Sequence, residues 1–415
     1  MSPPDSKRLE PAAAFDLLST AAKLLFANGQ TTERMVAAVE RLAAALGFRV
    51  SVFPRWGELA LRIEDVAGWR HEIIAVEPAG VDMNKVVATM GLIDEVCDGR
   101  METSAARSAL EAITHFPPVS ILRFALMAAA GAAALGVIFG VSHLLGLVLI
   151  AIGAGAGACL RRWLAGKSRN LFIQPFCAAI LAGIIGAIVV RLQVSSALLL
   201  VAVCPCMVLV PGPHFLNGMI DLARARIVLG AARLAYAGLI TLMICTGLLL
   251  GLALGGVDLP PSGPFSPAPF LYDVLAAGVA VAAYGSFFAM PWRMLPIPIL
   301  IGMLAHALRW GALSMGTSAE IGALVACLLV GTVTAPIADR LRLPFAGIAF
   351  ASVVSLIPGV FLFRMAGGMV DLVTLGDHST PELVTQIASD GTTALLIILA
   401  MAFGLIFPRI CIDWH

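Results

Sequence analysis

The chain has 415 residues, of which 60% are hydrophobic and 13% are charged, and its net charge is +1. About a quarter of the residues of a soluble domain are charged, so we expect much of this chain to lie in lipid. The near-neutral balance argues against a nucleic-acid binder, which would need a basic face.

A more polar region occupies residues 1–118 and holds 28 of the 53 charged side chains. Helical spacing predicts helices over about 12–26, 32–46, 82–99 and 103–115. Between the second and third, the runs FRVSVFP, LALRIE and HEIIAVE are strand-like. We therefore expect a small α+β domain that ends at Pro117-Pro118. The start of the chain carries no apolar signal segment, which predicts that this domain is cytoplasmic.

Ten apolar stretches of spanning or near-spanning length follow, which predicts a polytopic α-helical membrane protein. They cover about 119–141, 144–163, 171–190, 196–213, 227–254, 271–290, 294–310, 318–336, 345–363 and 391–408. With the N-terminus inside, ten basic residues lie on the inner side: Arg161, Arg162, Lys167, Arg169, Arg224, Arg226, Arg293, Arg340, Arg342 and Arg409. The outer side has three: Arg191, Arg309 and Arg364. This bias supports a multi-pass protein with its N-terminus in the cytoplasm.

The membrane part contains an internal repeat. The segment from Val190 and the segment from Asp339 share Arg-Leu, an apolar run, Pro-Gly, and then Gly-Met-hydrophobic-Asp-Leu. The copies are five spans apart, so the second is inverted relative to the first. We expect two inverted five-helix repeats, over 119–256 and 257–415, an arrangement found in many secondary transporters.

Each copy has a Pro-Gly pair inside its apolar segment: Pro211-Gly212 and Pro358-Gly359. Proline removes a backbone donor and glycine loosens a helix, so the pair either breaks the span or ends it at the membrane surface. Transporters of this type bind substrate near the midplane at broken helices. We therefore predict that these four residues contribute to substrate binding.

Ionisable residues in or near the spans are candidates for function, because charges there are costly. Arg233 could bind a substrate carboxylate or extend to the inner surface. Asp221 and Asp371 are related by the repeat and, with Glu320, are candidates for proton coupling; the alternative for all three is a solvated or capping acid. Asp273 is predicted to cap a helix.

Uncharged polar residues could also contact a small substrate or join helices. They are Asn170, Gln174, Ser195, Ser196, Asn217, Ser352 and Ser355, with Gln174 and Asn217 taken as binding candidates. Cys204-Pro205-Cys206 could bind a soft metal. Since the chain lacks a P-loop and an ATP-binding domain, we expect buried thiols here, with no metal and no cofactor.

The turn Gly29-Gln-Thr-Thr-Glu-Arg34, the following helix, the ten spans and Pro-Gly before Gly-Met-Ile-Asp-Leu together resemble the threonine/serine exporter family in its fused form. The resemblance implies an inner-membrane exporter of small amino acids, driven as an antiporter by the proton gradient. Related two-subunit members imply dicarboxylates such as succinate as an alternative substrate. Val36 stands where family members often carry an acid, so a role for that acid is not expected here.

Two other classes of protein remain to be weighed. A membrane scaffold or signalling protein would act through its soluble domain, but it would have no need of inverted symmetry. A hydrolase would need a nucleophile and a base in a recognisable motif, and the sequence has none, so we predict that the chain is not an enzyme. The sequence leaves the oligomeric state open, a homo-oligomer included.

Overall fold

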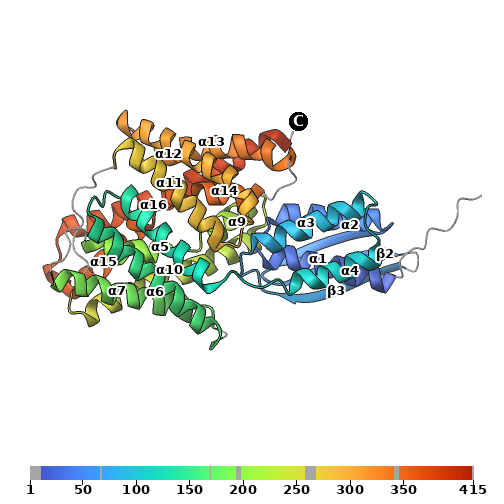
Figure 1. Ribbon diagram of the computed structural model, residues 1–415, viewed down its shortest axis with the longest axis horizontal. Helices are drawn as coiled ribbons and strands as arrows, with labels where there is room; N and C mark the ends of the chain where they lie inside the picture. The colour runs from blue at the N-terminus through green and yellow to red at the C-terminus, as the bar shows by residue number, and fades with distance from the viewer. Residues whose placement is uncertain are drawn as a thin grey trace, which may run out of the picture.

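The computed structural model describes residues 11–65, 68–168, 170–192, 198–257, 268–340 and 345–413. An N-terminal domain and a larger helical part lie one after the other along the long axis of the molecule (Figure 1). Arg169, Ser195, Ser196 and Arg342, and the Pro-rich residues 258–267, lie outside the described residues.

The N-terminal domain packs four helices with a three-stranded antiparallel sheet of order β1-β2-β3. Its elements are α1 (Pro11–Ala27), α2 (Thr32–Ala45), β1 (Arg49–Arg55), β2 (Gly57–Asp65), β3 (Gly68–Val76), α3 (Met83–Cys97) and α4 (Thr103–Thr114). Alternate residues of β2, namely Leu59, Leu61 and Ile63, are buried, and α1 contacts this strand and β3. Burial of one face of the sheet under α1 provides the core, and the α+β prediction is confirmed.

The helical part begins at α5 (Ile121–Ile138). It continues with α6 (Leu144–Ala165), α7 (Ile173–Arg191), α8 (Leu198–Met207), α9 (Gly212–Ala223), α10 (Ile227–Leu254), α11 (Phe270–Phe287), α12 (Pro296–Ser314), α13 (Ala319–Arg340), α14 (Phe345–Val353), α15 (Gly359–Leu375) and α16 (Pro381–Asp413). Among the described residues, nine helices are long and apolar enough to cross a membrane, or ten if the bent pair α8–α9 is one span. The chain is a polytopic helical membrane protein.

Two of the predicted spans are broken by a turn and extend further than the sequence indicates. The fourth consists of α8 and α9, which meet at a 54° bend. The ninth consists of α14, the 3-10 turn η2 (Val354–Leu356) and α15. Polar residues such as Asn217 and Asp221 lower the hydropathy of the second helix, so the sequence pattern ends each span too early.

The same pairs of helices pack together in both halves of the helical part. In the first half α6 contacts α7 and α8, α7 contacts α10, and α9 contacts α10; in the second, α12, α13, α14, α15 and α16 repeat this set. Glycines allow close approach in corresponding places. A Cβ on Gly251 of α10 would lie 3.0 Å from Gly183 of α7, and one on Gly331 of α13 would lie 2.6 Å from the carbonyl of Gly404 in α16. The halves therefore share one packing scheme.

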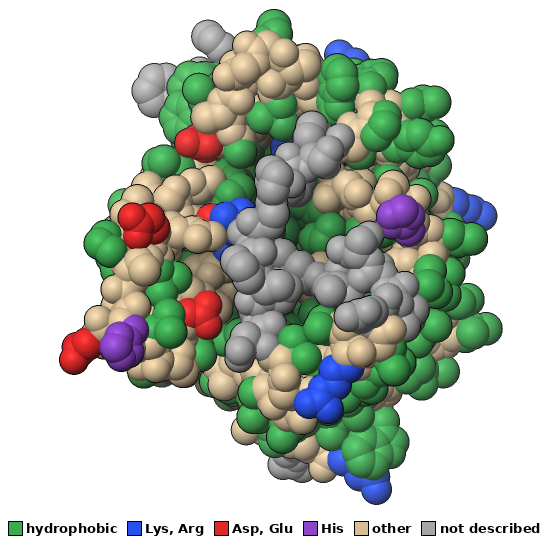
Figure 2. All heavy atoms as spheres, turned by 90° about the vertical axis from the view of Figure 1, so that its left-hand side faces the viewer, with side chains coloured by type: hydrophobic (Ala, Val, Ile, Leu, Met, Phe, Trp, Pro, Cys, Tyr) green, Lys and Arg blue, Asp and Glu red, His purple; other side chains and the backbone are tan. Residues whose placement is uncertain are grey.

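The two broken spans meet the N-terminal domain at different ends. Asp221, near the end of α9, bonds to Thr32 of that domain, whereas Phe345, the first residue of α14, lines a cavity with Thr31. The first broken span thus runs toward the N-terminal domain and the second runs away from it. Figure 2 shows the opposite end of the molecule, where hydrophobic side chains are widespread and charged side chains of both signs lie among them, several of them at the rim.

Candidate functional site

The two Pro-Gly breaks have the same local conformation. Pro211 has φ −81° and ψ 61°, and Pro358 has φ −77° and ψ 45°. In both, the glycine N–H donates to the carbonyl two residues earlier, from Gly212 to Val210 at 2.9 Å and from Gly359 to Ile357 at 2.8 Å. This is an inverse γ-turn, and it ends one short helix and starts the next.

Each Pro-Gly break packs against residues of the other half of the helical part. A Cβ on Gly212 would lie 2.6 Å from Ile357 and closer still to the ring of Phe350, both in the second half. A Cβ on Gly359 would lie 2.9 Å from Met207, in the first half. Glycine is needed at both positions because another helix occupies the space of a side chain. The structure therefore brings the four predicted residues Pro211, Gly212, Pro358 and Gly359 into one junction.

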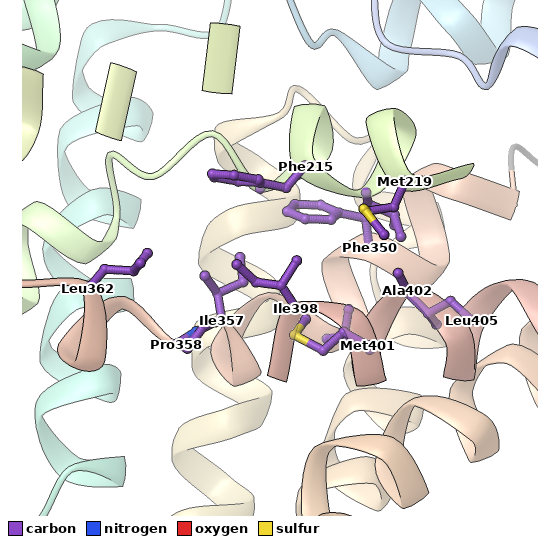
Figure 3. A pocket seen from close by; sticks show the side chains of 13 residues that line it. Phe215, Met219, Phe350, Ile357, Pro358, Leu362, Ile398, Met401, Ala402 and Leu405 are labelled. Atoms are coloured by element: carbon purple, nitrogen blue, oxygen red, sulfur yellow. The ribbon is translucent and has the colours of Figure 1, made fainter. Parts of the chain in front are cut away.

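A small cavity lies at this junction (Figure 3). Its walls come from α9, α14, the second break and α16, and the labelled side chains are apolar, among them Phe215, Phe350, Ile398 and Met401. The cavity has a volume of about 30 Å³. Ligand pockets have volumes of about 300 Å³ or more, so the space at the junction is about the size of one water molecule and too small for an amino acid.

A buried ion pair lies between this junction and the N-terminal domain. Nε of Arg233 in α10 is 3.3 Å from Oδ2 of Asp221 in α9, and each side chain is 1% exposed. Thr32 of α2 donates to the same carboxylate oxygen at 3.0 Å, and Arg233 donates to Thr32 at 3.4 Å. Arg226 is 3.6 Å from the second carboxylate oxygen. Arg233 therefore does not extend to the surface, and its charge is matched by Asp221 inside the protein.

Other residues of the Gly29–Arg34 turn also contact the helical part. The amide of Asn217 donates to the carbonyl of Gly29 at 3.3 Å. Glu33 forms an ion pair with Arg224 at the end of α9. Arg34 pairs with Asp339 of α13 at 2.5 Å, and the same carboxylate pairs with Arg409 of α16 at 2.5 Å. The turn on which the family resemblance partly rests is thus one of the parts of the N-terminal domain that dock onto the helices.

Two cavities flank this docked turn. One, of about 310 Å³, lies between α2, α3 and the ends of α13 and α16 and is lined by Arg34, Arg41, Asp94 and Asp339 among others. The other, of about 160 Å³, adjoins Thr31 and the end of α9. The larger space reaches the volume of a ligand pocket and lies on the side of the junction that faces the N-terminal domain.

A second ion pair lies on the other side of the junction. Nε of Arg364 in α15 is 3.1 Å from Oδ2 of Asp390 in α16, and the Asp390 side chain is 7% exposed. By their place in the repeat, α15 and α16 correspond to α9 and α10, but the charges of the pair are exchanged. In the first half the acid is on α9 and the arginine on α10, whereas in the second half the arginine is on α15 and the acid on α16. Arg364, predicted to lie in an outer loop, is therefore a paired residue inside the helical part.

A third polar cluster lies inside the second half. Nδ1 of His306 in α12 is 2.9 Å from Oδ2 of Asp273 in α11, and Nε2 is 2.8 Å from Oγ of Ser355 in η2. His306 is fully buried, and the other two are at most 4% exposed. Asp273 is not the helix cap that the sequence predicts: it lies in the first turn, buried, and Pro269 holds the cap position. The sequence analysis missed His306, although an ionisable residue in a predicted span is itself a signal.

The remaining candidates lie apart from these clusters. Gln174 is in the first turn of α7 and half-buried, and Glu320 is in the first turn of α13 and half-buried. Asp371 is half-buried near the end of α15, whereas its repeat partner Asp221 is buried near the end of α9. The environments of the two repeat-related acids therefore differ.

Comparison with known proteins was made over the whole chain. A family model for threonine/serine exporters matches residues 16–255, and a second model of that description matches residues 273–411. The first match includes the N-terminal domain and the helices of the first half, and the second covers most of the second half. No solved structure matches the chain.

Proposed function

The chain belongs to the threonine/serine exporter family, and we propose that it is a secondary transporter that carries threonine, serine or a similar small metabolite out of the cytoplasm. In this proposal it lies in a bacterial inner membrane, the N-terminal domain faces the cytoplasm, and export is coupled to protons as antiport. The observation that carries the proposal is the junction at which the two Pro-Gly breaks cross.

The two halves are proposed to form an inverted repeat that works by alternating access. The shared packing scheme supports this, as does the direction of the two broken spans, one toward the N-terminal domain and one away from it. Substrate would bind at the junction when the halves separate, because the present cavity of about 30 Å³ is too small. Backbone groups freed at the breaks would then supply polar contacts that the apolar walls lack.

The buried ion pairs are proposed to be the two gates. Asp221–Arg233 lies on the side of the N-terminal domain, and Arg364–Asp390 lies beyond the junction. A substrate carboxylate could replace Asp221 at Arg233, because both offer the same acceptor geometry to a guanidinium. Thr32 joins the first gate from the N-terminal domain, so this domain would hold the gate closed until substrate arrives.

The test is transport by the purified protein in liposomes. Labelled threonine, serine and succinate are supplied in turn, with and without a pH gradient. Gradient-stimulated flux of threonine or serine is the expected result, and flux of succinate alone would assign the chain to dicarboxylate export. Absence of flux for all three substrates would refute the transporter proposal and leave the scaffold function as the alternative.

A further inference from the structure

We propose that Asp273, His306 and Ser355 are the site at which the second half binds and releases the coupling proton. The inference rests on the proposed function, because it names the groups that would link proton movement to transport. It extends beyond the candidates that the sequence supplies for this role, Asp221, Glu320 and Asp371, none of which touches these three residues in the contacts described above.

The three side chains form a continuous hydrogen-bonded chain. The Asp273 carboxylate contacts one ring nitrogen of His306 at 2.9 Å, and the Ser355 hydroxyl contacts the other at 2.8 Å. With a neutral ring, Nδ1–H donates to Asp273 and Nε2 accepts from the hydroxyl. When the ring takes a proton, Nε2 becomes a donor, so Ser355 must turn its own hydroxyl hydrogen toward another acceptor. One proton therefore reverses the direction of the bond at Ser355.

That reversal occurs beside the second Pro-Gly break. Ser355 lies in η2, three residues before Pro358. Asp273 is in the first turn of α11, at the end of the helical part remote from the N-terminal domain. The hydrogen-bonded side chains thus lead from the first turn of α11 to the junction of the two halves. Under the proposed orientation a proton entering from outside would reach Asp273 and His306 before it reached the junction.

Charged groups on neighbouring helices lie around the His306 ring. Asp273 from α11 faces it directly, and Arg309, on the same helix as His306, interacts electrostatically with Asp273. A Cβ on Gly322 of α13 would lie 3.4 Å from the Arg309 stem, so α13, which has Glu320 in its first turn, packs beside Arg309. With the ring neutral, Asp273 and Arg309 balance, and with the ring charged the cluster has one added positive charge inside the protein.

The first half shows that the fold does not require these polar groups. Gly153 of α6 packs against Pro205 as Gly302 of α12 packs against Ser352, so these positions correspond. At the position of His306, four residues after Gly302, the first half has Gly157. At the position of Ser355, three residues before the Pro-Gly pair, it has Val208. At the position of Asp273, in the first turn of α11, it has Phe124 in the first turn of α5. The first half is apolar at all three. Buried polar groups that packing does not need are more often retained for function.

The order acid–histidine–serine is also that of a hydrolase. The Ser355 side chain, however, is buried, at 4% exposed, and hydrolysis would require a path for an acyl group to its hydroxyl. A proton needs no such path, only the hydrogen-bonded chain, so the observations favour proton binding. Hydrolase chemistry remains as an outcome of the test.

The experiment uses the full-length protein in liposomes and two assays of labelled threonine or serine: exchange at equal pH, and accumulation driven by a pH gradient. In the Asp273→Asn and His306→Gln variants we expect exchange to continue and gradient-driven accumulation to fall at least tenfold. The matched control is His143→Gln, an exposed histidine before α6, which should keep both activities. Gradient-driven accumulation within twofold of wild type in both variants would overturn the inference.

A second measurement separates this inference from the proposed function. Ring signals of isotopically labelled histidine, with the His306 signal identified by its loss in His306→Gln, are followed by NMR as pH changes. If the His306 signal changes with pH, and this change differs in Asp273→Asn, the proton site is supported even if no tested substrate is transported. A ring that never titrates between about pH 5 and 9, around the ordinary histidine value, overturns it. Labelling of Ser355 by a fluorophosphonate would also overturn it, in favour of a hydrolase.

Discussion

The hydroxyl group of Thr32 donates a hydrogen bond of 3.0 Å to the Asp221 carboxylate, across the contact between the N-terminal domain and α9. Arg233 donates to the same hydroxyl at 3.4 Å, so one threonine joins both members of a buried ion pair. In a buried network each polar group depends on its partners, because water cannot replace them. The N-terminal domain is thereby linked to the helix that follows the first break.

We expect Thr32→Val to loosen this link. Valine keeps the shape of threonine but leaves the Asp221 oxygen without its donor, which costs about 1–3 kcal/mol in a buried site. Hydrogen exchange measured by mass spectrometry should become faster in residues 29–34 and 212–226. Thr103→Val, at the partly exposed start of α4, serves as the control and should leave both segments unchanged. Unaltered protection in Thr32→Val would show that the hydroxyl does not hold the domain in place.

The Asp221–Arg233 pair should behave as a coupled unit in a double-mutant cycle. Arg233→Gln leaves the buried carboxylate with only the partly exposed Arg226 as a counter-charge, so the free energy of unfolding should fall by about 3–5 kcal/mol. The double variant Asp221→Asn with Arg233→Gln should lose less than the two single losses combined, because neither fully buried charge remains and Arg226 is 30% exposed. Thermal and denaturant unfolding in detergent give these values.

The control for the cycle is the pair Arg55–Glu58, whose side chains are 72% and 39% exposed. Changes to this surface pair should alter stability by at most ~1 kcal/mol. Additive losses at Asp221 and Arg233 would mean that the two charges do not stabilise each other. Full transport by a folded Arg233→Gln variant would remove Arg233 from the gate and from substrate binding.

Much of the architecture follows from sequence patterns. The helices and strands of the N-terminal domain were predictable because alternation and helical spacing mark one buried face in each element, as in Leu59, Leu61 and Ile63 of β2. The spans were predictable because lipid demands long apolar runs. Pro-Gly marked both breaks, since the backbone chemistry of proline and glycine acts locally.

The polar clusters were harder to predict because their members are far apart in the chain. Thr32 and Asp221 are separated by 189 residues, and His306 and Ser355 by 49. No spacing rule relates them, because the contacts depend on how the domain docks and how α12 meets η2. Single ionisable residues in spans could be singled out, but their partners could not, and so Asp273 was assigned to a helix end instead of to His306.

Stability should depend on pH through Asp82, which caps α3 by accepting from the Lys85 N–H at 3.1 Å. Burial raises the pKa of this carboxyl above its ordinary value, against the effects of Lys85 that lower it. The folded state then binds the proton more tightly than the unfolded state. The contribution of Asp82 should therefore decline as pH rises from about 3.9, the ordinary pKa of aspartate, through the higher folded value.

Asp82→Asn tests this dependence, because it keeps an acceptor for the cap but cannot titrate. Its unfolding temperature, compared with that of wild type over a pH series, should decline less as pH rises. Asp82→Ala also removes the acceptor and should lose about 1 kcal/mol at every pH. Parallel pH curves for wild type and Asp82→Asn would contradict the expectation.

An added methyl group should destabilise the protein more at one Pro-Gly break than at the other. In Gly212→Ala the new methyl group would lie 2.6 Å from Ile357 and closer still to the ring of Phe350, and neither can withdraw without moving the second half. We expect a loss of about 1–3 kcal/mol and impaired transport. Gly359→Ala would meet Met207 at 2.9 Å. Methionine is flexible and can move, so this change should cost less.

Gly238→Ala is the matched control, because a Cβ there has nothing within 4 Å. In the middle of α10 it should be neutral or stabilise by up to about 1 kcal/mol through helix propensity. Unfolding temperatures in detergent and flux in liposomes are measured for all three variants. If Gly212→Ala and Gly238→Ala have the same unfolding temperature and the same flux, the two halves do not meet at the first break as closely as the distances to Phe350 and Ile357 require. The junction could then not be the point about which the halves move.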